Sequence, residues 1–128
     1  MMKKTILLDT NFLLIPGEYG VDIFSEIEKI ADFPYQLAIV DGTVDELDSI
    51  IANQRGKYSR AAQLGKDLIK TKNLNMVRST SEKTVDDIIV DLAKNDENLI
   101  VATQDKELKK CLSNRLIILK QGKYLTFV

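Results

Sequence analysis

The sequence predicts an α/β fold in which helices cover both faces of a central parallel sheet of four or five strands. Short runs of consecutive apolar residues, typical of strands buried on both faces, recur along the chain, and segments with apolar side chains at helical spacing separate them. Such alternation favours parallel strands joined by right-handed crossovers. A length of 128 residues with 45% hydrophobic side chains suits one core, so we expect a single domain over residues 1–128.

The strands are predicted from these apolar runs and from the residues that end them. The first run ends at Asp9, and Thr10 and Asn11 then open a short helix. The sheet has clear candidates at residues 6–8, 37–40, 99–102 and 116–119, a short strand around 76–77, and an edge strand at 124–128.

The helices are predicted from apolar periodicity and from residues that favour helix starts. Thr43 and Glu46 have the spacing of a capping box, in which Thr43 caps the helix and the Glu46 carboxylate bonds back to the amide of the cap. Thr84 has the same relation to Asp87, which leaves Asp86 as the freer of these two acids. The helical segments are residues 12–14, 21–30, 43–51, 61–69, 84–93 and 106–112.

The composition excludes several kinds of catalytic site. The chain contains no histidine, which removes the commonest general base and every Ser–His, Cys–His or His–zinc arrangement. Its single cysteine, Cys111, rules out an internal disulfide, and we expect it to be a packing residue. No apolar run approaches the about 18 residues that span a bilayer, and the first one is too short for a secretory signal, so we expect a cytoplasmic protein without membrane contact.

Four acidic positions come directly after predicted strands or on the first turns of predicted helices: Asp9, Glu46, Asp86 or Asp87, and Asp105. Each also has a local explanation as a helix cap. In a parallel sheet, however, these positions share the carboxyl edge of the strands, where ligands bind. Carboxylates that gather there raise one another's pKa values unless a cation neutralises them, and all-oxygen sites suit Mg²⁺ or Mn²⁺. A metal-bound water is then a nucleophile suited to a phosphodiester.

Four acidic segments, residues 8–12, 43–47, 84–87 and 100–109, resemble in order the four acidic motifs of PIN-domain nucleases. Residues 102–110 are most similar to the branch that processes small-subunit ribosomal RNA. The toxin ribonucleases of toxin–antitoxin pairs share the acids but resemble this chain less. The resemblance implies an α/β/α sandwich, a metal-dependent endoribonuclease and often a homodimer.

The resemblance also implies roles for individual residues. Asp9, Glu46, Asp86 and Asp105 would hold Mg²⁺ or Mn²⁺ and carry catalysis, with Asp87 kept as the other candidate for the third acid. Asn11 and Thr103 would orient these ligands.

An RNA partner needs basic side chains around this acidic centre, and the sequence offers two candidate rims. One rim is Arg55, Lys57, Arg60, Lys66 and Lys70, and the other is Lys106, Lys109 and Lys110 beside Asp105. Such phosphate contacts would make affinity fall with salt. Each basic residue could equally belong to a solvated helix face.

Two other functions fit the same pattern. A phosphoacceptor receiver domain has a similar length and an acidic Mg²⁺ pocket, and it could use Asp9, Thr103 and Lys120. A PIN fold could also bind RNA without cutting it and act in assembly.

Overall fold

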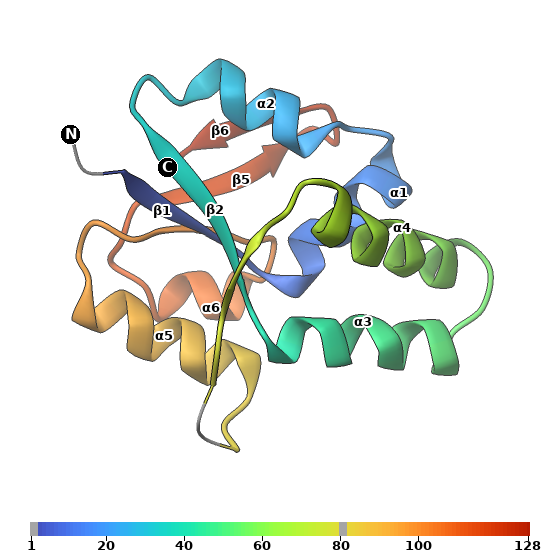
Figure 1. Cartoon of the computed structure of the whole chain (residues 1–128). Helices are drawn as coiled ribbons and strands as arrows, with labels where there is room; N and C mark the ends of the chain where they lie inside the picture. Colours follow the sequence, from blue (N-terminus) through green and yellow to red (C-terminus); the bar gives the residue numbers. More distant parts are fainter. Residues whose placement is uncertain (1–2, 80–81) are drawn as a thin grey trace.

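The computed structural model, which describes residues 3–79 and 82–128, has one mixed sheet between two layers of helices (Figure 1). The sheet has six strands in the order β3-β2-β1-β4-β5-β6, and β1 to β5 are parallel. The strands are β1 (Lys4–Leu8), β2 (Tyr35–Val40), β3 (Asn75–Val77), β4 (Ile100–Ala102), β5 (Leu116–Lys120) and β6 (Tyr124–Phe127). The predicted α/β sandwich is therefore confirmed.

The five parallel strands agree with the four or five expected, and β6 is the edge strand predicted at residues 124–128. β6 returns antiparallel beside β5, because Gln121 and Gly122 make a tight turn with positive φ values of 56° and 64°. The backbone N–H of Lys123 donates to the carbonyl of Lys120 at 3.0 Å, and positive φ at both central residues is typical of a type I′ turn. The last strand thus closes one edge of an otherwise parallel sheet.

The helices divide between the two faces of the sheet according to the alternation of side chains along the strands. Ile6 and Leu8 pack with one group of helices, whereas Leu7 packs with the other group. The first face carries η1 (Thr10–Leu14), α1 (Ile15–Tyr19), α2 (Ile23–Ile30), α3 (Gly42–Asn53) and α4 (Lys57–Thr71), and the second carries α5 (Val85–Asn95) and α6 (Lys106–Lys110).

The start of α3 differs from the predicted capping box. The N-cap is Asp41, whose side chain accepts a hydrogen bond from the backbone N–H of Gly42 at 2.8 Å. Thr43 lies inside the first turn, fully buried, where its hydroxyl pairs with that of Thr10 across 3.0 Å. The capping box was wrong because a contact between distant segments uses the side chains that a local pattern assigns to the helix end.

The other predicted helix starts and ends have mixed outcomes. Thr84 caps α5 as expected, and its hydroxyl accepts from the backbone N–H of Asp87 at 3.2 Å. α6 ends at Lys110, earlier than the predicted residue 112, and Cys111 follows it as an exposed C-cap. The expectation that Cys111 packs in the core was therefore wrong.

The strand order argues against the receiver alternative. Receiver domains have the flavodoxin-like order 2-1-3-4-5, whereas the five parallel strands here have the order 3-2-1-4-5. In the observed order β1 lies between β2 and β4, and the direction of winding reverses between β1 and β4. Ligands of such sheets bind outside this switch point, which is where Asp9 follows β1.

Close packing fixes the segment that follows Asp9. A Cβ atom on Gly65 of α4 would come within 2.7 Å of the carbonyl oxygen of Leu13 in η1, so only glycine lets the two helices approach this closely.

Over the residues that the structure describes, no helix has both the length and the apolar character needed to cross a bilayer.

Candidate active site

Three of the predicted acids meet at the carboxyl edge of the sheet. Asp9 follows β1, Asp86 lies on the first turn of α5, and Asp105 is the N-cap of α6. One carboxylate oxygen from each of these side chains lies within 4.8 Å of the other two. Asp87, the other candidate for the third acid, does not belong to this group.

Asp9 is the buried member of the group, with 3% of its surface exposed. Its Oδ1 accepts from the backbone N–H of Thr10 at 2.8 Å, and its Oδ2 accepts from the Thr103 hydroxyl at 2.7 Å. Burial raises the pKa of Asp9 to about 6, against the opposing effect of these hydrogen bonds, and the charges of Asp86 and Glu46 add to the increase. An ionised Asp9 is therefore costly without a neighbouring cation.

Thr103 and Asn11 fix the loop that carries Asp105. The Thr103 hydroxyl donates to Asp9 and accepts from the backbone N–H of Asp105 at 3.0 Å, so it joins two of the acids. Asn11 Oδ1 accepts from the backbone N–H of Gln104 at 3.1 Å. The two residues predicted to orient the acids thus contact the loop between β4 and α6.

Glu46 lies on the wall of the same cavity but outside the group of three carboxylates. Its Oε1 accepts a hydrogen bond from the Thr10 hydroxyl. Thr10 was not among the predicted site residues, although its position directly after Asp9 could have identified it. It connects the end of β1 to the first turns of α3 and so determines where Glu46 lies.

A cavity of about 370 Å³ opens over these acids. Burial, followed by the charges of Asp105 and Glu46, raises the pKa of Asp86 as well. The cavity is lined by Asp9, Thr10, Asn11, Leu14, Glu46, Ser49, Ile50, Asp86 and Asp105. A lining that offers converging carboxylate oxygens and no histidine or cysteine side chain fits a hard divalent cation.

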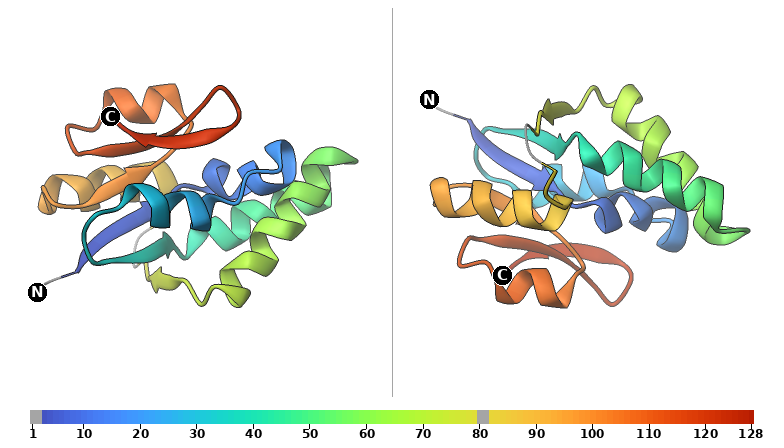
Figure 2. Two further views of the ribbon diagram at one scale, coloured as in Figure 1. Left: turned by 90° about the horizontal axis from the view of Figure 1, so that it is seen from above. Right: turned by 90° about the horizontal axis from the view of Figure 1, so that it is seen from below.

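The two predicted basic rims lie on different sides of the molecule. Figure 2 shows α6 beside the β5–β6 hairpin, with α4 on the opposite side in both views. Arg55, Lys57 and Arg60 lie at the tip of the α3–α4 pair, whereas Lys106, Lys109 and Lys110 follow directly after Asp105.

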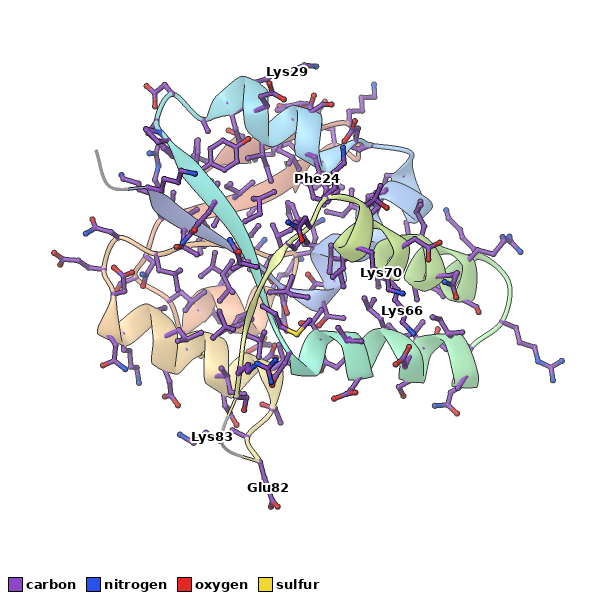
Figure 3. All side chains as sticks on the ribbon, viewed as in Figure 1. Phe24, Lys29, Lys66, Lys70, Glu82 and Lys83 are labelled. Atoms are coloured by element: carbon purple, nitrogen blue, oxygen red, sulfur yellow. The ribbon has the colours of Figure 1, made fainter. Side chains whose placement is uncertain are left out.

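Part of the α4 rim is neutralised. Lys66 Nζ makes an ion pair with Asp48 of α3 at 2.6 Å. Figure 3 shows Lys66 and Lys70 in the space between α3 and α4. Neither lysine lines the acidic cavity.

Comparisons with known proteins agree with this fold. The chain is 34% identical over 124 residues to ribonuclease VapC4 of Methanocaldococcus jannaschii, a match that covers 93% of this chain and 92% of the relative. Its fold is similar to that of the PIN domain endonuclease Utp24, with a TM-score of 0.77 at 20% identity over 96% of this chain and 90% of the other. Residues 6–121 match the family described as PIN like domain, and the chain therefore belongs to this family.

Proposed function

We propose that the protein is an endoribonuclease that hydrolyses RNA phosphodiester bonds at the acidic cavity with the help of Mg²⁺ or Mn²⁺. The observation that carries the proposal is the meeting of Asp9, Asp86 and Asp105, which arrive from three separate parts of the chain. A chain without histidine has few other routes to hydrolysis at neutral pH.

The residues divide into ligands and orienting groups. Asp9, Asp86 and Asp105 would supply oxygen ligands, and Glu46 would complete the acidic lining on the α3 side. Thr103 holds the Asp9 carboxylate by a hydrogen bond, and Asn11 holds the backbone next to Asp105. When bound, the divalent ion would lower the pKa of a coordinated water and offset the charge of the phosphodiester.

The similarity to a ribonuclease over nearly the whole chain supports RNA as the substrate. The resemblance of residues 102–110 to the last motif of the branch that processes small-subunit ribosomal RNA supports ribosomal RNA as the candidate substrate. Cleavage of precursor ribosomal RNA at discrete positions, with an unrelated RNA of equal length left intact, is the result that would support this narrower assignment.

The test of the general proposal is cleavage of end-labelled RNA by purified protein with Mn²⁺, with Mg²⁺ and with EDTA. We expect cleavage with either ion, none in EDTA, and a reduction of more than ~100-fold in Asp9→Asn, since even residues that only orient metal ligands cost ~10–100-fold. Asp45→Asn is the matched control, because Asp45 is an exposed acid on the first turn of α3 outside the cavity.

Equal activity in Asp9→Asn and wild type would assign the cleavage to a contaminant and contradict the proposal. RNA binding without cleavage under all three conditions would favour the alternative of a non-cleaving PIN domain that acts in assembly.

A further inference from the structure

Three lysines, Lys106, Lys109 and Lys120, lie on one side of the acidic cavity, and we call them the lysine cluster. Lys106 and Lys109 are on α6, directly after its N-cap Asp105. Lys120 is the last residue of β5, at the carboxyl edge of the sheet. Lys120 was not among the basic residues expected to contact RNA.

Hydrogen bonds and strand alternation bring Lys120 to α6. Gln104, between Thr103 and Asp105, accepts from the backbone N–H of Leu119 at 3.0 Å through its side-chain oxygen, which ties the end of β5 to the loop that carries Asp105. Along β5, Leu116 packs on the α5–α6 face and Leu119 on the other face. Lys120 therefore points toward the face that carries α6.

The positive charges of this cluster are not neutralised. Over the described part of the chain, no carboxylate lies within ion-pair distance of these three side chains, whereas the neighbouring Lys110 pairs with Glu107 at 3.3 Å. The pKa of Lys109 is lowered by partial burial and by the charges of Lys106 and Lys120, with Asp105 opposing this effect. Like charges held together in this way favour an anion between them.

The exposed surface of α3, whose Glu46 lines the cavity, has the other sign. Asp45, Glu46 and Asp48 are exposed on α3, and Lys66 of α4 already pairs with Asp48. An RNA backbone that leaves the cavity over α3 would meet these carboxylates first. The route over α6 and the end of β5 meets unpaired lysines.

We propose that the lysine cluster binds the RNA backbone next to the phosphate that is cut, so that the RNA leaves the cavity over α6 and the end of β5. The proposal rests on the proposed function for the identity of the ligand. Lys109 lies four residues beyond Asp105, about one helical turn or ~6 Å along the axis, so the cluster is placed for an adjacent phosphate of the same strand. Lysine contacts to phosphates carry no base specificity, so the effect should not depend on the RNA sequence.

The experiment compares two triple variants with the same change in charge. Lys106→Gln/Lys109→Gln/Lys120→Gln removes the cluster, and Lys29→Gln/Lys72→Gln/Lys94→Gln removes three exposed lysines elsewhere. Binding of two fluorescein-labelled single-stranded RNAs of different sequence is measured by fluorescence anisotropy in EDTA over a series of salt concentrations. Because EDTA prevents metal-dependent cleavage, the binding result is independent of whether the protein is a nuclease.

We expect the cluster variant to bind both RNAs ~10-fold or more weakly, with the salt dependence of the affinity reduced by ~0.7 for each phosphate that the variant no longer binds. The control variant should bind as wild type. Equally weakened binding in the two variants, or wild-type binding in the cluster variant, would overturn the proposal. A third variant, Arg55→Gln/Lys57→Gln/Arg60→Gln, removes three basic residues of the α4 rim. If only this variant binds RNA more weakly, the α4 rim binds the RNA backbone and the proposal is wrong.

A second measurement needs no variant. Acetylation of the wild-type protein with and without RNA, read by mass spectrometry, should show protection of Lys106, Lys109 and Lys120. Unchanged acetylation of these three lysines at saturating RNA would contradict the proposed path.

Discussion

The acids of the cavity come from two kinds of segment, and the structure holds them in different ways. Asp9 and Asp105 follow β1 and β4, and both carboxylates accept hydrogen bonds from backbone N–H groups. The Thr103 hydroxyl also donates to Asp9 and accepts from the backbone N–H of Asp105. Glu46 lies just after the first turn of α3 and Asp86 on the first turn of α5, and both residues are exposed. The strand-end loops therefore hold their acids by several hydrogen bonds, whereas on the helices Glu46 accepts one from Thr10 and Asp86 is exposed.

This difference separates effects on stability from effects on activity. Removing a strand-end hydrogen bond leaves buried polar groups without partners, which costs folding free energy as well as geometry. Removing the carboxylate of Asp86, an exposed residue, leaves no such buried group behind. Substitutions in the two kinds of segment should therefore have distinguishable effects.

The largest expected effect on activity comes from Asp86. Asp86→Asn should lower RNA cleavage by more than ~100-fold, because it removes one of the three converging carboxylates. The free energy of unfolding in EDTA should not fall, since the raised pKa of Asp86 means that its charge is unfavourable in the folded state. Cleavage assays and urea unfolding check the two parts.

Asp87→Asn is the matched control for this prediction, because Asp87 is the next residue on the same helical turn and lies outside the group of three. It should retain activity close to wild type. If Asp87→Asn instead loses activity while Asp86→Asn retains it, the third acid is assigned to the wrong residue.

Thr103 is expected to affect both stability and activity. Thr103→Val keeps the shape of this fully buried side chain but removes the hydroxyl that donates to Asp9 and accepts from the N–H of Asp105. Unpaired buried groups of this kind cost about 1–3 kcal/mol of folding free energy, and the absence of an orienting partner lowers activity by ~10–100-fold. Urea unfolding and RNA cleavage measure the two effects.

Thr103→Ser restores the hydroxyl and should recover most of both the stability and the activity. A Thr103→Val protein with wild-type activity would show that the loop after β4 is not fixed through this side chain.

Much of the fold could be predicted from the sequence, because the buried strands are continuous apolar runs with distinct ends. The edge strand at residues 124–128 was predicted without its direction, since a parallel strand and the second strand of an antiparallel hairpin produce similar short apolar segments. What distinguishes them is the turn at Gln121 and Gly122. The strand order, which separates this fold from a receiver domain, follows from pairing between distant segments and has no local signature.

The sequence predicted which acids belong to the candidate site, because each of them follows a strand or lies near the start of a helix. Sequence alone left Asp86 and Asp87 open, because both lie on one turn, and only the direction of α5 relative to β1 and β4 separates them. The capping box at Thr43 and Glu46 failed for a related reason. Thr10, far away in the chain, bonds to both side chains, and no local pattern contains that contact.

The third prediction concerns stability alone: it measures the cost of burying the charge of Asp9 and tests the strand-end part of the site without any substrate. The folded pKa of about 6 lies above the ordinary value of 3.8, so the folded chain binds more protons between these pH values than the unfolded chain. The folding free energy lost by burying the ionised Asp9 is therefore largest above about pH 6. This loss shrinks as the pH falls and is absent below the unfolded pKa of 3.8. In EDTA, Asp9→Asn should be more stable than wild type by about 3 kcal/mol at about pH 7.5 and by little at about pH 4.

The difference in unfolding free energy between wild type and Asp9→Asn reports the Asp9 carboxyl group together with its electrostatic coupling to Asp86 and Glu46. Mn²⁺ or Mg²⁺ should reverse the order at about pH 7.5, since an ion that binds only the folded wild type stabilises it by mass action. Urea unfolding at both pH values, with EDTA and with Mn²⁺, measures all of these quantities. If Asp9→Asn is less stable than wild type in EDTA at about pH 7.5, the hydrogen bonds from Thr10 and Thr103 outweigh the cost of the buried charge. The cavity would then tolerate its carboxylates without a cation.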